Sequence, residues 1–196
     1  MSLTDTATRA AETSVPLLPA LAERWSPRAF DASATIDEDK LTAALEAARW
    51  SPSAANTQPW RFIVARRGSE AFDTIVGSLM GFNTAWAGAA SVLIVAVAEV
   101  VDAEGNERRW ATYDLGQAMA HLSVQAHHDG LHVHQMGGFD PEALRAAFGI
   151  EGRFTPVSVT ALGTLGDVDA LPEALREREL APRTRRPLPE VLLVNE

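Results

Sequence analysis

Residues 51–64 read Ser51-Pro-Ser-Ala-Ala-Asn-Thr-Gln-Pro-Trp-Arg-Phe-Ile-Val64, and they join two different kinds of secondary structure. Apolar residues at helical spacing before this stretch predict a helix over residues 35–50. Pro52 disfavours helical backbone in the residue before it, so we expect a loop over residues 51–59. Residues 60–66 then have the pattern of a strand. A helix, a loop of small residues and a strand therefore form the starting unit of the fold.

The rest of the chain continues to alternate between helical and extended patterns. A capping box at Thr35–Glu38 should begin the first helix. Further helices are predicted at residues 69–79, 110–129 and 140–149, and further strands at residues 91–100, 131–135 and 155–163. The interleaved elements indicate one α+β domain over residues 1–196, with an N-terminal extension or helix at 1–20. Residues 166–196 lack clear periodicity, and we expect this C-terminal arm to lie over the body or over a partner subunit.

Composition excludes several classes of function. The net charge of -9 and the pI near 5.0 argue against nucleic-acid binding, which depends on clustered cations. The chain has no cysteine, so thiol chemistry, disulfides and cysteine-ligated metals are excluded, and any redox chemistry needs a bound cofactor. The longest apolar run is far shorter than the roughly 20 residues of a membrane helix, and residues 1–20 do not resemble a secretory signal. We therefore expect a cytoplasmic protein without a membrane partner.

Three further segments could bind a ligand. Arg24, Ser26 and Arg28 alternate, so they share one side of an extended chain, and their guanidinium groups suit a phosphate. Arg183-Thr-Arg-Arg-Pro187 is a second cationic run, and Gly137-Gly138 exposes backbone amides beside a predicted helix start. In the 51–59 loop, small side chains would let the backbone approach a flat heterocycle, to which the Asn56 amide can donate and accept. Each segment has an ordinary reading as well, namely a solvated surface run, a turn or a connecting loop.

Taken together and in this order, the segments resemble the nitroreductase family of flavoproteins. Arg24-Trp-Ser-Pro-Arg-Ala-Phe30 is similar to the family's opening signature, and residues 51–64 match its Ser-Pro-Ser-x-x-Asn-x-Gln-Pro-Trp loop closely. Gly81-Phe-Asn83 and Gly137-Gly-Phe-Asp140 resemble two further family positions. The resemblance runs from about Leu21 to Pro187. It implies a nitroreductase-like fold, with a central, mostly antiparallel sheet flanked by helices, in an intertwined homodimer.

The resemblance also implies a function. The protein would bind FMN, take hydride from NADH or NADPH onto the flavin N5 atom and pass electrons to a small organic acceptor such as a nitroaromatic or a quinone, by a ping-pong mechanism. The partner subunit would supply part of each FMN site, and no side chain is assigned as catalytic or as a metal ligand. The implied FMN contacts are Arg24, Trp25, Ser26, Arg28, Pro52, Ser53, Ala54, Asn56, Asn83, Gly137, Gly138, Arg183 and Arg185. The arginines would hold the phosphate and the ribityl chain, and the glycine backbone would face N5.

Two departures from the family pattern bear on the acceptor. Gly137 stands where the family has a glutamate, and Ala54 stands where it has a second serine. Neither change removes the cofactor site, but the sequence leaves the physiological acceptor and the choice between NADH and NADPH open.

Two other functions fit parts of the sequence. A flavin-binding protein without turnover, acting as a store or a sensor, would use the same cofactor residues. A metallohydrolase is the other alternative, because His128, His132 and His134 have spacings compatible with a metal. Against it, Gly130 interrupts the predicted helix between His128 and His132. His121 and His127 belong to the same histidine-rich segment.

Overall fold

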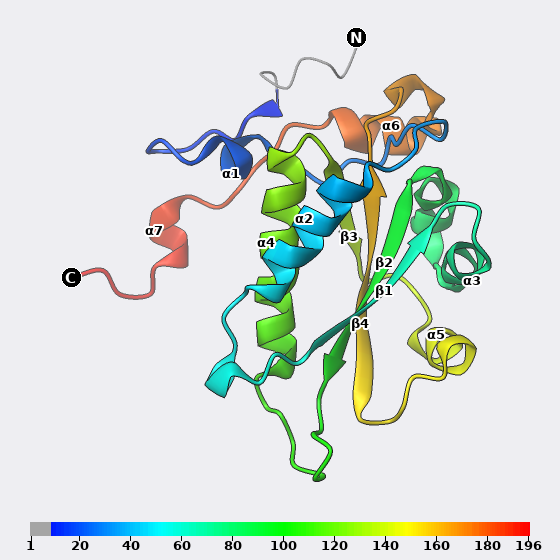
Figure 1. Cartoon of the computed structure of the whole chain (residues 1–196). Helices are drawn as coiled ribbons and strands as arrows, with labels where there is room; N and C mark the ends of the chain where they lie inside the picture. The colour runs from blue at the N-terminus through cyan, green and yellow to red at the C-terminus, as the bar shows by residue number, and fades with distance from the viewer. Residues whose placement is uncertain (1–8) are drawn as a thin grey trace.

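The computed structural model describes residues 9–196, and an antiparallel sheet of four strands lies at the centre of this part of the chain (Figure 1). The strands are β1 (Trp60–Arg66), β2 (Val92–Glu99), β3 (His132–Met136) and β4 (Phe154–Gly163). Their order across the sheet is β1-β2-β4-β3, and each neighbouring pair is antiparallel. The predicted α+β fold with a central antiparallel sheet is therefore confirmed.

Strand β2 explains why helices cover both faces of this sheet. Every residue of β2 is buried, as the apolar run over residues 92–98 predicts, and the strand ends on a buried charged residue, Glu99. Successive side chains point to opposite faces. Ile94 and Ala96 belong to one buried apolar cluster, whereas Leu93 and Val95 belong to a second one. The domain thus has two hydrophobic cores that share one sheet.

Helices form the outer layers around the sheet (Figure 1). Helices α2 (Glu38–Arg49) and α4 (Ala111–His128) pack against each other over one face, and α3 (Glu70–Ser78) and α5 (Pro141–Phe148) lie over the other. The remaining α-helices are short: α1 (Pro19–Glu23), α6 (Glu173–Leu180) and α7 (Leu188–Val191). Single turns of 3-10 helix are η2 (Ala54–Asn56), η3 (Gly81–Ala85), η4 (Ala87–Ala89) and η5 (Val168–Ala170).

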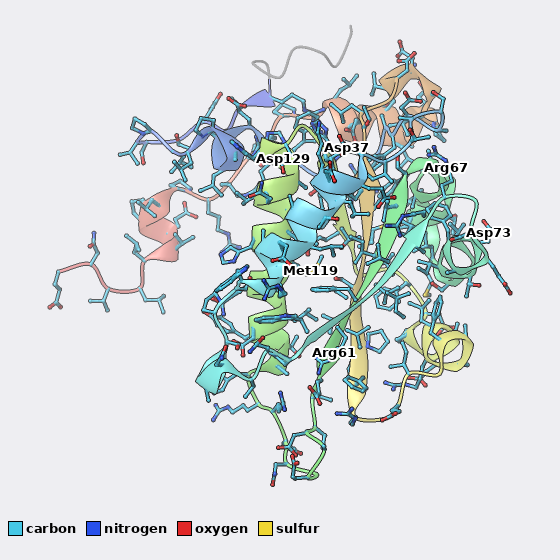
Figure 2. All side chains as sticks on the ribbon, viewed as in Figure 1. Asp37, Arg61, Arg67, Asp73, Met119 and Asp129 are labelled. Atoms are coloured by element: carbon cyan, nitrogen blue, oxygen red, sulfur yellow. The ribbon has the colours of Figure 1, made fainter. Side chains whose placement is uncertain are left out.

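The helix ends follow local chemistry. Asp37 lies at the start of helix α2 (Figure 2). Its side chain accepts hydrogen bonds from the backbone N–H groups of Asp39 and Lys40, so the helix begins at Glu38. The predicted Thr35–Glu38 capping box is therefore wrong: an aspartate is the stronger cap, and the Glu38 carboxylate pairs with Arg66 instead of returning to the backbone.

Helix α5 ends and begins as predicted. Asp140 caps its first turn by accepting from two backbone N–H groups, and Pro141 occupies the first helical position. Gly149 closes it in the left-handed conformation, with φ of 62°. This helix follows directly after Gly137-Gly138, so its cap also fixes where that turn lies.

The C-terminal segment contains a helix that the sequence did not predict. Helix α6 packs on the chain's own body, where Leu175 joins one of the two cores and Glu179 is buried. Arg183 also donates to the Ala22 carbonyl of the same chain, and Arg185 lines a pocket with Arg24. Contact of the arm with a partner therefore stays a prediction for the residues after Arg185. In Figure 1, α7 and the C-terminus extend away from the body. At the other end, residues 1–8 of the expected N-terminal extension lie outside the described part, and the first α-helix begins at Pro19.

Candidate functional site

Both cationic runs meet in one pocket. Its volume is about 240 Å³, and it lies where the segment after α1 passes the end of α6. Among residues 9–196, its charged and polar lining consists of Arg9, Arg24, Ser26, Arg28, Arg178, Glu179, Arg183 and Arg185, together with Trp25. Arg24 and Arg183, far apart in sequence, therefore line the same pocket, and their binding of FMN stays a prediction.

Glu179 organises the floor of this arginine pocket. Its side chain is 1% exposed. One carboxylate oxygen accepts from the Trp25 indole N–H at 3.2 Å and the other from the Arg28 backbone N–H at 2.9 Å. The guanidinium of Arg28 lies 3.6 Å from the same carboxylate, and that of Arg9 lies 3.9 Å away. Sequence reasoning missed Glu179, because it sits in a charged segment without periodicity and its partners are about 150 positions earlier.

The pocket holds more arginines than carboxylates, and this excess of positive charge contributes to lowered arginine pKa values. Burial lowers the pKa of Arg24, and the nearby positive charge of Arg185 lowers it further. Burial also lowers the pKa of Arg183, with smaller contributions from Arg24, Arg185 and Arg9. Positive charges that are partly buried and repel one another are relieved by a bound anion. The forked guanidinium geometry matches phosphate oxygens in particular.

A second hollow continues from the arginine pocket. It has a volume of about 250 Å³ and shares Arg24 and Ser26 with the first. Its other lining residues come mainly from helix α4 and strand β3, and they are largely apolar: Leu21, Ala120, Ser123, Val124, Val133 and Gln135. A phosphate in the arginine pocket would thus lie beside a less polar hollow that follows β3 toward Gly137.

The turn after β3 is held by Asn83. The Asn83 amide donates to the Gly138 carbonyl at 3.1 Å, and the Met80 backbone N–H donates to the same oxygen at 3.0 Å. A Cβ atom at Gly138 would lie 2.9 Å from the Asn83 amide nitrogen, so glycine permits this close approach. Gly137 is exposed and has free space around it. Asn83 therefore lies beside Gly137 and Gly138, and their contacts with FMN stay a prediction.

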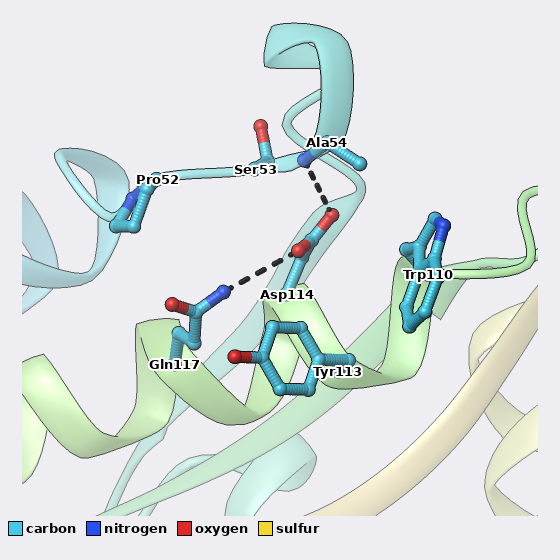
Figure 3. A pocket seen from close by; sticks show the side chains of 7 residues that line it. All are labelled: Pro52, Ser53, Ala54, Trp110, Tyr113, Asp114 and Gln117. Atoms are coloured by element: carbon cyan, nitrogen blue, oxygen red, sulfur yellow. Dashed lines mark hydrogen bonds between the residues drawn. The ribbon is translucent and has the colours of Figure 1, made fainter.

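The loop after α2 lines a different pocket. Pro52, Ser53 and Ala54 face Trp110, Tyr113, Asp114 and Gln117, as Figure 3 shows, around a space of about 230 Å³. The Ala54 backbone N–H donates to the Asp114 carboxylate at 3.0 Å, and the side chain of Gln117 lies 3.4 Å from its other oxygen. Asp114 is buried, at 3% exposure. This acidic residue was not identified from the sequence.

One chain thus carries two separate groups of the expected FMN contacts. Pro52, Ser53 and Ala54 do not line the hollows that hold Arg24 and Ser26. The loop pocket and the apolar hollow nevertheless lie along one face of α4, from Tyr113 to Val124. This distance is about 16 Å at the rise of an α-helix. A second subunit packed along this face could bring its loop to the other's arginine pocket.

The rings of His127 and His132 pack edge to face, with their centroids 5.4 Å apart, but the other histidines have separate surroundings. His134 Nδ1 lies 2.9 Å from the Pro27 carbonyl and its ring packs on Trp86, whereas His132 packs edge-on to Trp25. Burial lowers the pKa of both imidazoles to about 4. Within the described chain, no group of three or more histidines or acids is arranged to hold a metal ion. The metallohydrolase alternative therefore has no site among these residues.

Comparison with known proteins identifies the family. The sequence profile of the Nitroreductase family matches residues 21–164, which is well over half of the chain. This chain belongs to the nitroreductase family. The resemblance to that family, inferred from four segments of which residues 51–64 match most closely, is confirmed.

Individual relatives agree with this membership. A solved structure described as "the oxidoreductase containing FMN" is 37% identical, with a TM-score of 0.88 and 95% of each chain covered. An uncharacterised 15.4 kDa protein of Mycolicibacterium smegmatis, from the ask 5′ region, is 42% identical over 142 residues, or 67% of this chain and 92% of that protein. A Bacillus subtilis (strain 168) protein named "Putative NAD(P)H nitroreductase YdgI" is 25% identical over 74% of this chain and 86% of its own length.

Some of the site lies beyond the family match. Arg183 and Arg185 fall after residue 164, yet they line the same pocket as Arg24 and Arg28. Separately, none of the helices in the described part of this nitroreductase-family chain is both long and apolar enough to cross a membrane.

Proposed function

We propose that this nitroreductase-family protein is an FMN-dependent oxidoreductase that takes electrons from NADH or NADPH and passes them to a small organic acceptor. The arginine pocket is the observation that carries the proposal. Its partly buried cations exceed the single Glu179 charge among its described lining residues, and the pocket opens into an apolar hollow beside Arg24. A phosphate with a flat organic group attached fits both parts. The 37% identical relative described as containing FMN supports the choice of cofactor.

The residues of the chain would then divide the work of binding. The two cationic runs, Arg24 to Arg28 and Arg183 to Arg185, would hold the phosphate and the ribityl chain. Asn83 holds the turn at Gly137-Gly138 in place, which would direct backbone groups toward the ring system. Bound FMN would supply the two-electron chemistry, accepting hydride from NAD(P)H and reducing the acceptor in a ping-pong cycle. We assign no catalytic side chain and expect protons to come from water.

We also propose that the site is shared between two subunits. Pro52, Ser53, Ala54 and Asn56 would reach the partner's FMN, since in one chain their loop lies apart from the arginine pocket. Two exposed aromatic residues line the pocket of this loop, Tyr113 at 65% and Trp110 at 52%, and Trp50, two residues before Pro52, is 76% exposed. Packing these rings against a second copy would remove them from water.

The absorption spectrum of the purified protein, before and after anaerobic addition of NADH or NADPH, tests the proposal. Bound flavin should give bands at about 370 and 450 nm that bleach when the donor is added. Bands that persist with both donors would instead favour a flavin store or sensor. A colourless protein that FMN does not reconstitute would refute the cofactor assignment.

A further inference from the structure

The loop that carries Ala54 and Asn56 has an unfavourable backbone. Ala55, Asn56 and Gln58 have φ values of 50°, 55° and 47°. Residues with a Cβ rarely occupy this left-handed region, and the strain persists only where the surroundings impose it. Within the loop, the Gln58 N–H donates to the Ser53 hydroxyl at 3.0 Å. The backbone N–H groups of Asn56 and Thr57 also donate within the loop, to the carbonyls of Ser53 and Ala54, and contacts from outside the loop add to these bonds.

The outer contacts converge on the carbonyl groups of four consecutive residues. Arg108 Nη1 donates to the Thr57 carbonyl at 2.9 Å. Arg61 Nη1 donates to the Gln58 carbonyl at 3.1 Å and to the Trp60 carbonyl at 2.8 Å. The Glu99 backbone N–H donates to the Pro59 carbonyl at 2.7 Å. The end of the loop is therefore held by two arginines and by Glu99.

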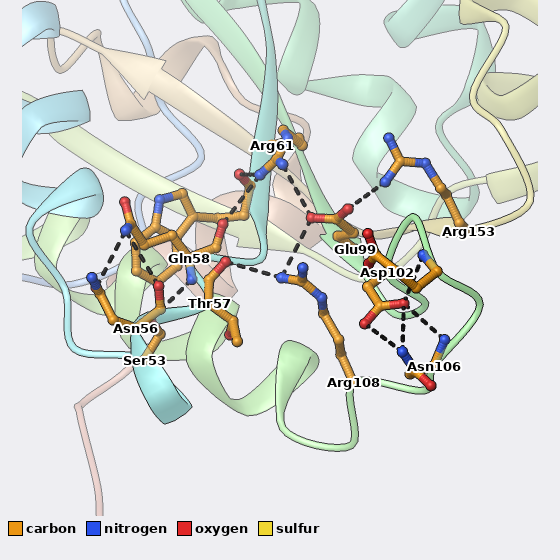
Figure 4. A network of polar contacts seen from close by, with 12 residues as sticks. Ser53, Asn56, Thr57, Gln58, Arg61, Glu99, Asp102, Asn106, Arg108 and Arg153 are labelled. Atoms are coloured by element: carbon orange, nitrogen blue, oxygen red, sulfur yellow. Dashed lines mark hydrogen bonds and ion pairs between the residues drawn. The ribbon is translucent and has the colours of Figure 1, made fainter.

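Glu99 also holds both arginines. Its side chain is 6% exposed, and it ends β2 directly beside the loop (Figure 4). Its carboxylate accepts from Arg61 Nη2 at 3.0 Å and lies 3.5 Å from Arg108 Nη1. Arg153, at the start of β4, donates to the other carboxylate oxygen. Without this buried negative charge, the guanidinium groups would repel one another.

We propose that Glu99 is a positioning residue for the loop at residues 51–59, called the flavin loop below. Glu99 fixes Arg61 and Arg108, and these arginines hold the carbonyls of residues 57, 58 and 60. This clamp imposes the strained turn at Ala54–Asn56. The consequence for FMN affinity rests on the proposed function, whereas the clamp itself does not. Asp114 holds the opposite end of the same turn through the Ala54 N–H. Two buried carboxylates thus fix the turn from both sides.

The chain offers a matched pair of variants for the test. Arg108→Met and Arg153→Met each remove one arginine from Glu99, but only Arg108 touches the loop. The first measurement is amide hydrogen exchange of the flavin-free protein. The amides of Asn56, Thr57 and Gln58, which are bonded within the loop, should exchange roughly tenfold faster in Arg108→Met. In Arg153→Met their rates should stay within about twofold of wild type.

A conservative replacement separates positioning from general stability. Both Arg108 contacts use Nη1, so the single ammonium of Arg108→Lys can replace them, and exchange should return most of the way to the wild-type rate. Arg61→Met provides a second disruptive variant if Arg108→Met does not fold, since its side chain is 52% exposed. Equal loop exchange rates in the loop-contacting and Arg153→Met variants would overturn the proposal.

FMN titration completes the test and keeps the two proposals apart. The Kd for FMN should rise roughly tenfold in Arg108→Met, stay near the wild-type value in Arg153→Met and recover in Arg108→Lys. A wild-type protein that binds no FMN would refute the proposed function while leaving the exchange result to decide the clamp. Faster loop exchange with an unchanged Kd would overturn the role of the clamp in FMN binding.

Discussion

At the scale of single residues, the arginine pocket shows how far a motif can lead. Arg24, Ser26, Arg28, Arg183 and Arg185 were expected to bind one phosphate, and the structure brings them together. Glu179 was not expected, because a buried carboxylate is recognised only by its partners, and these come from the other end of the chain. A motif therefore predicts the residues that face a ligand better than the residues, such as Glu179, that fix those residues in position.

Arg28 provides a direct test of the pocket. We expect Arg28→Ala to weaken FMN binding by about 2 kcal/mol, or roughly thirtyfold in Kd, because one charge-assisted contact to the phosphate is lost. It should also slow flavin reduction. Arg176→Ala is the control, since this arginine lies on α6 outside the pocket and pairs with Asp169. Equilibrium titration with FMN and stopped-flow reduction give both values. An Arg28→Ala protein with wild-type affinity and reduction rate would remove Arg28 from the site.

His132 predicts a pH dependence of stability. Burial lowers the pKa of His132 to about 4, with His127 as a second cause, against about 6.5 in the unfolded chain. Between these values the unfolded state holds a proton that the folded state does not, so stability is lost as the pH falls from 6.5 toward 4. At pH 5 the loss is about 2 kcal/mol, or roughly 4–8 °C in Tm for a domain of this size.

The variant His132→Phe should remove that loss. Neither ring nitrogen of His132 has a hydrogen-bond partner among residues 9–196, although both are buried, so an apolar ring suits the site and should raise Tm at pH 7 as well. Thermal unfolding of both proteins between pH 5 and 7.5 checks this. Parallel Tm curves for wild type and variant would show that another group dominates the acid sensitivity.

At the scale of elements, the sequence predicts the sheet and main helices well and the tail poorly. β2 is buried on both faces, and its apolar run has few alternatives. Helix α6 was missed because Leu175 is the apolar residue it buries, the other buried position being the charged Glu179. Such a helix has almost no apolar periodicity, and its stability comes from tertiary contacts. The N-cap of helix α2 was predicted at Thr35 instead of Asp37, because both residue types can cap a helix and they lie only two positions apart.

The flavin loop was predicted from the sequence, but its backbone conformation was not. Its sequence is the most specific part of the family resemblance, yet nothing in residues 51–59 indicates that Ala55, Asn56 and Gln58 adopt left-handed backbone. Such strain is imposed from outside, through Glu99 and Asp114, which lie about 40 and 60 positions later in the chain. Local propensity therefore predicts that a loop is present, whereas its conformation depends on contacts that sequence reading does not reveal.

At the scale of the whole molecule, the exposed apolar surface argues for a second copy. Helix α7 and the residues after it extend from the body (Figure 1) and expose Leu193 at 99% and Val194 at 74%. Burying an apolar side chain of this size contributes about 1.5–3 kcal/mol. A tail with such side chains in water has a physical reason to lie on a partner.

We expect sedimentation velocity to show a wild-type dimer and a weakened one when Leu193 and Val194 are both changed to aspartate. Losing two buried apolar side chains and introducing two charges should raise the dimer dissociation constant by at least about a hundredfold. Asn195→Asp is the matched control, because it adds a charge to the same tail without removing apolar surface. FMN affinity should fall together with dimer content if each site needs the partner's loop. A double variant that dimerises as tightly as wild type would show that the tail does not reach the partner, and a monomeric wild-type protein that still binds FMN would refute the shared site.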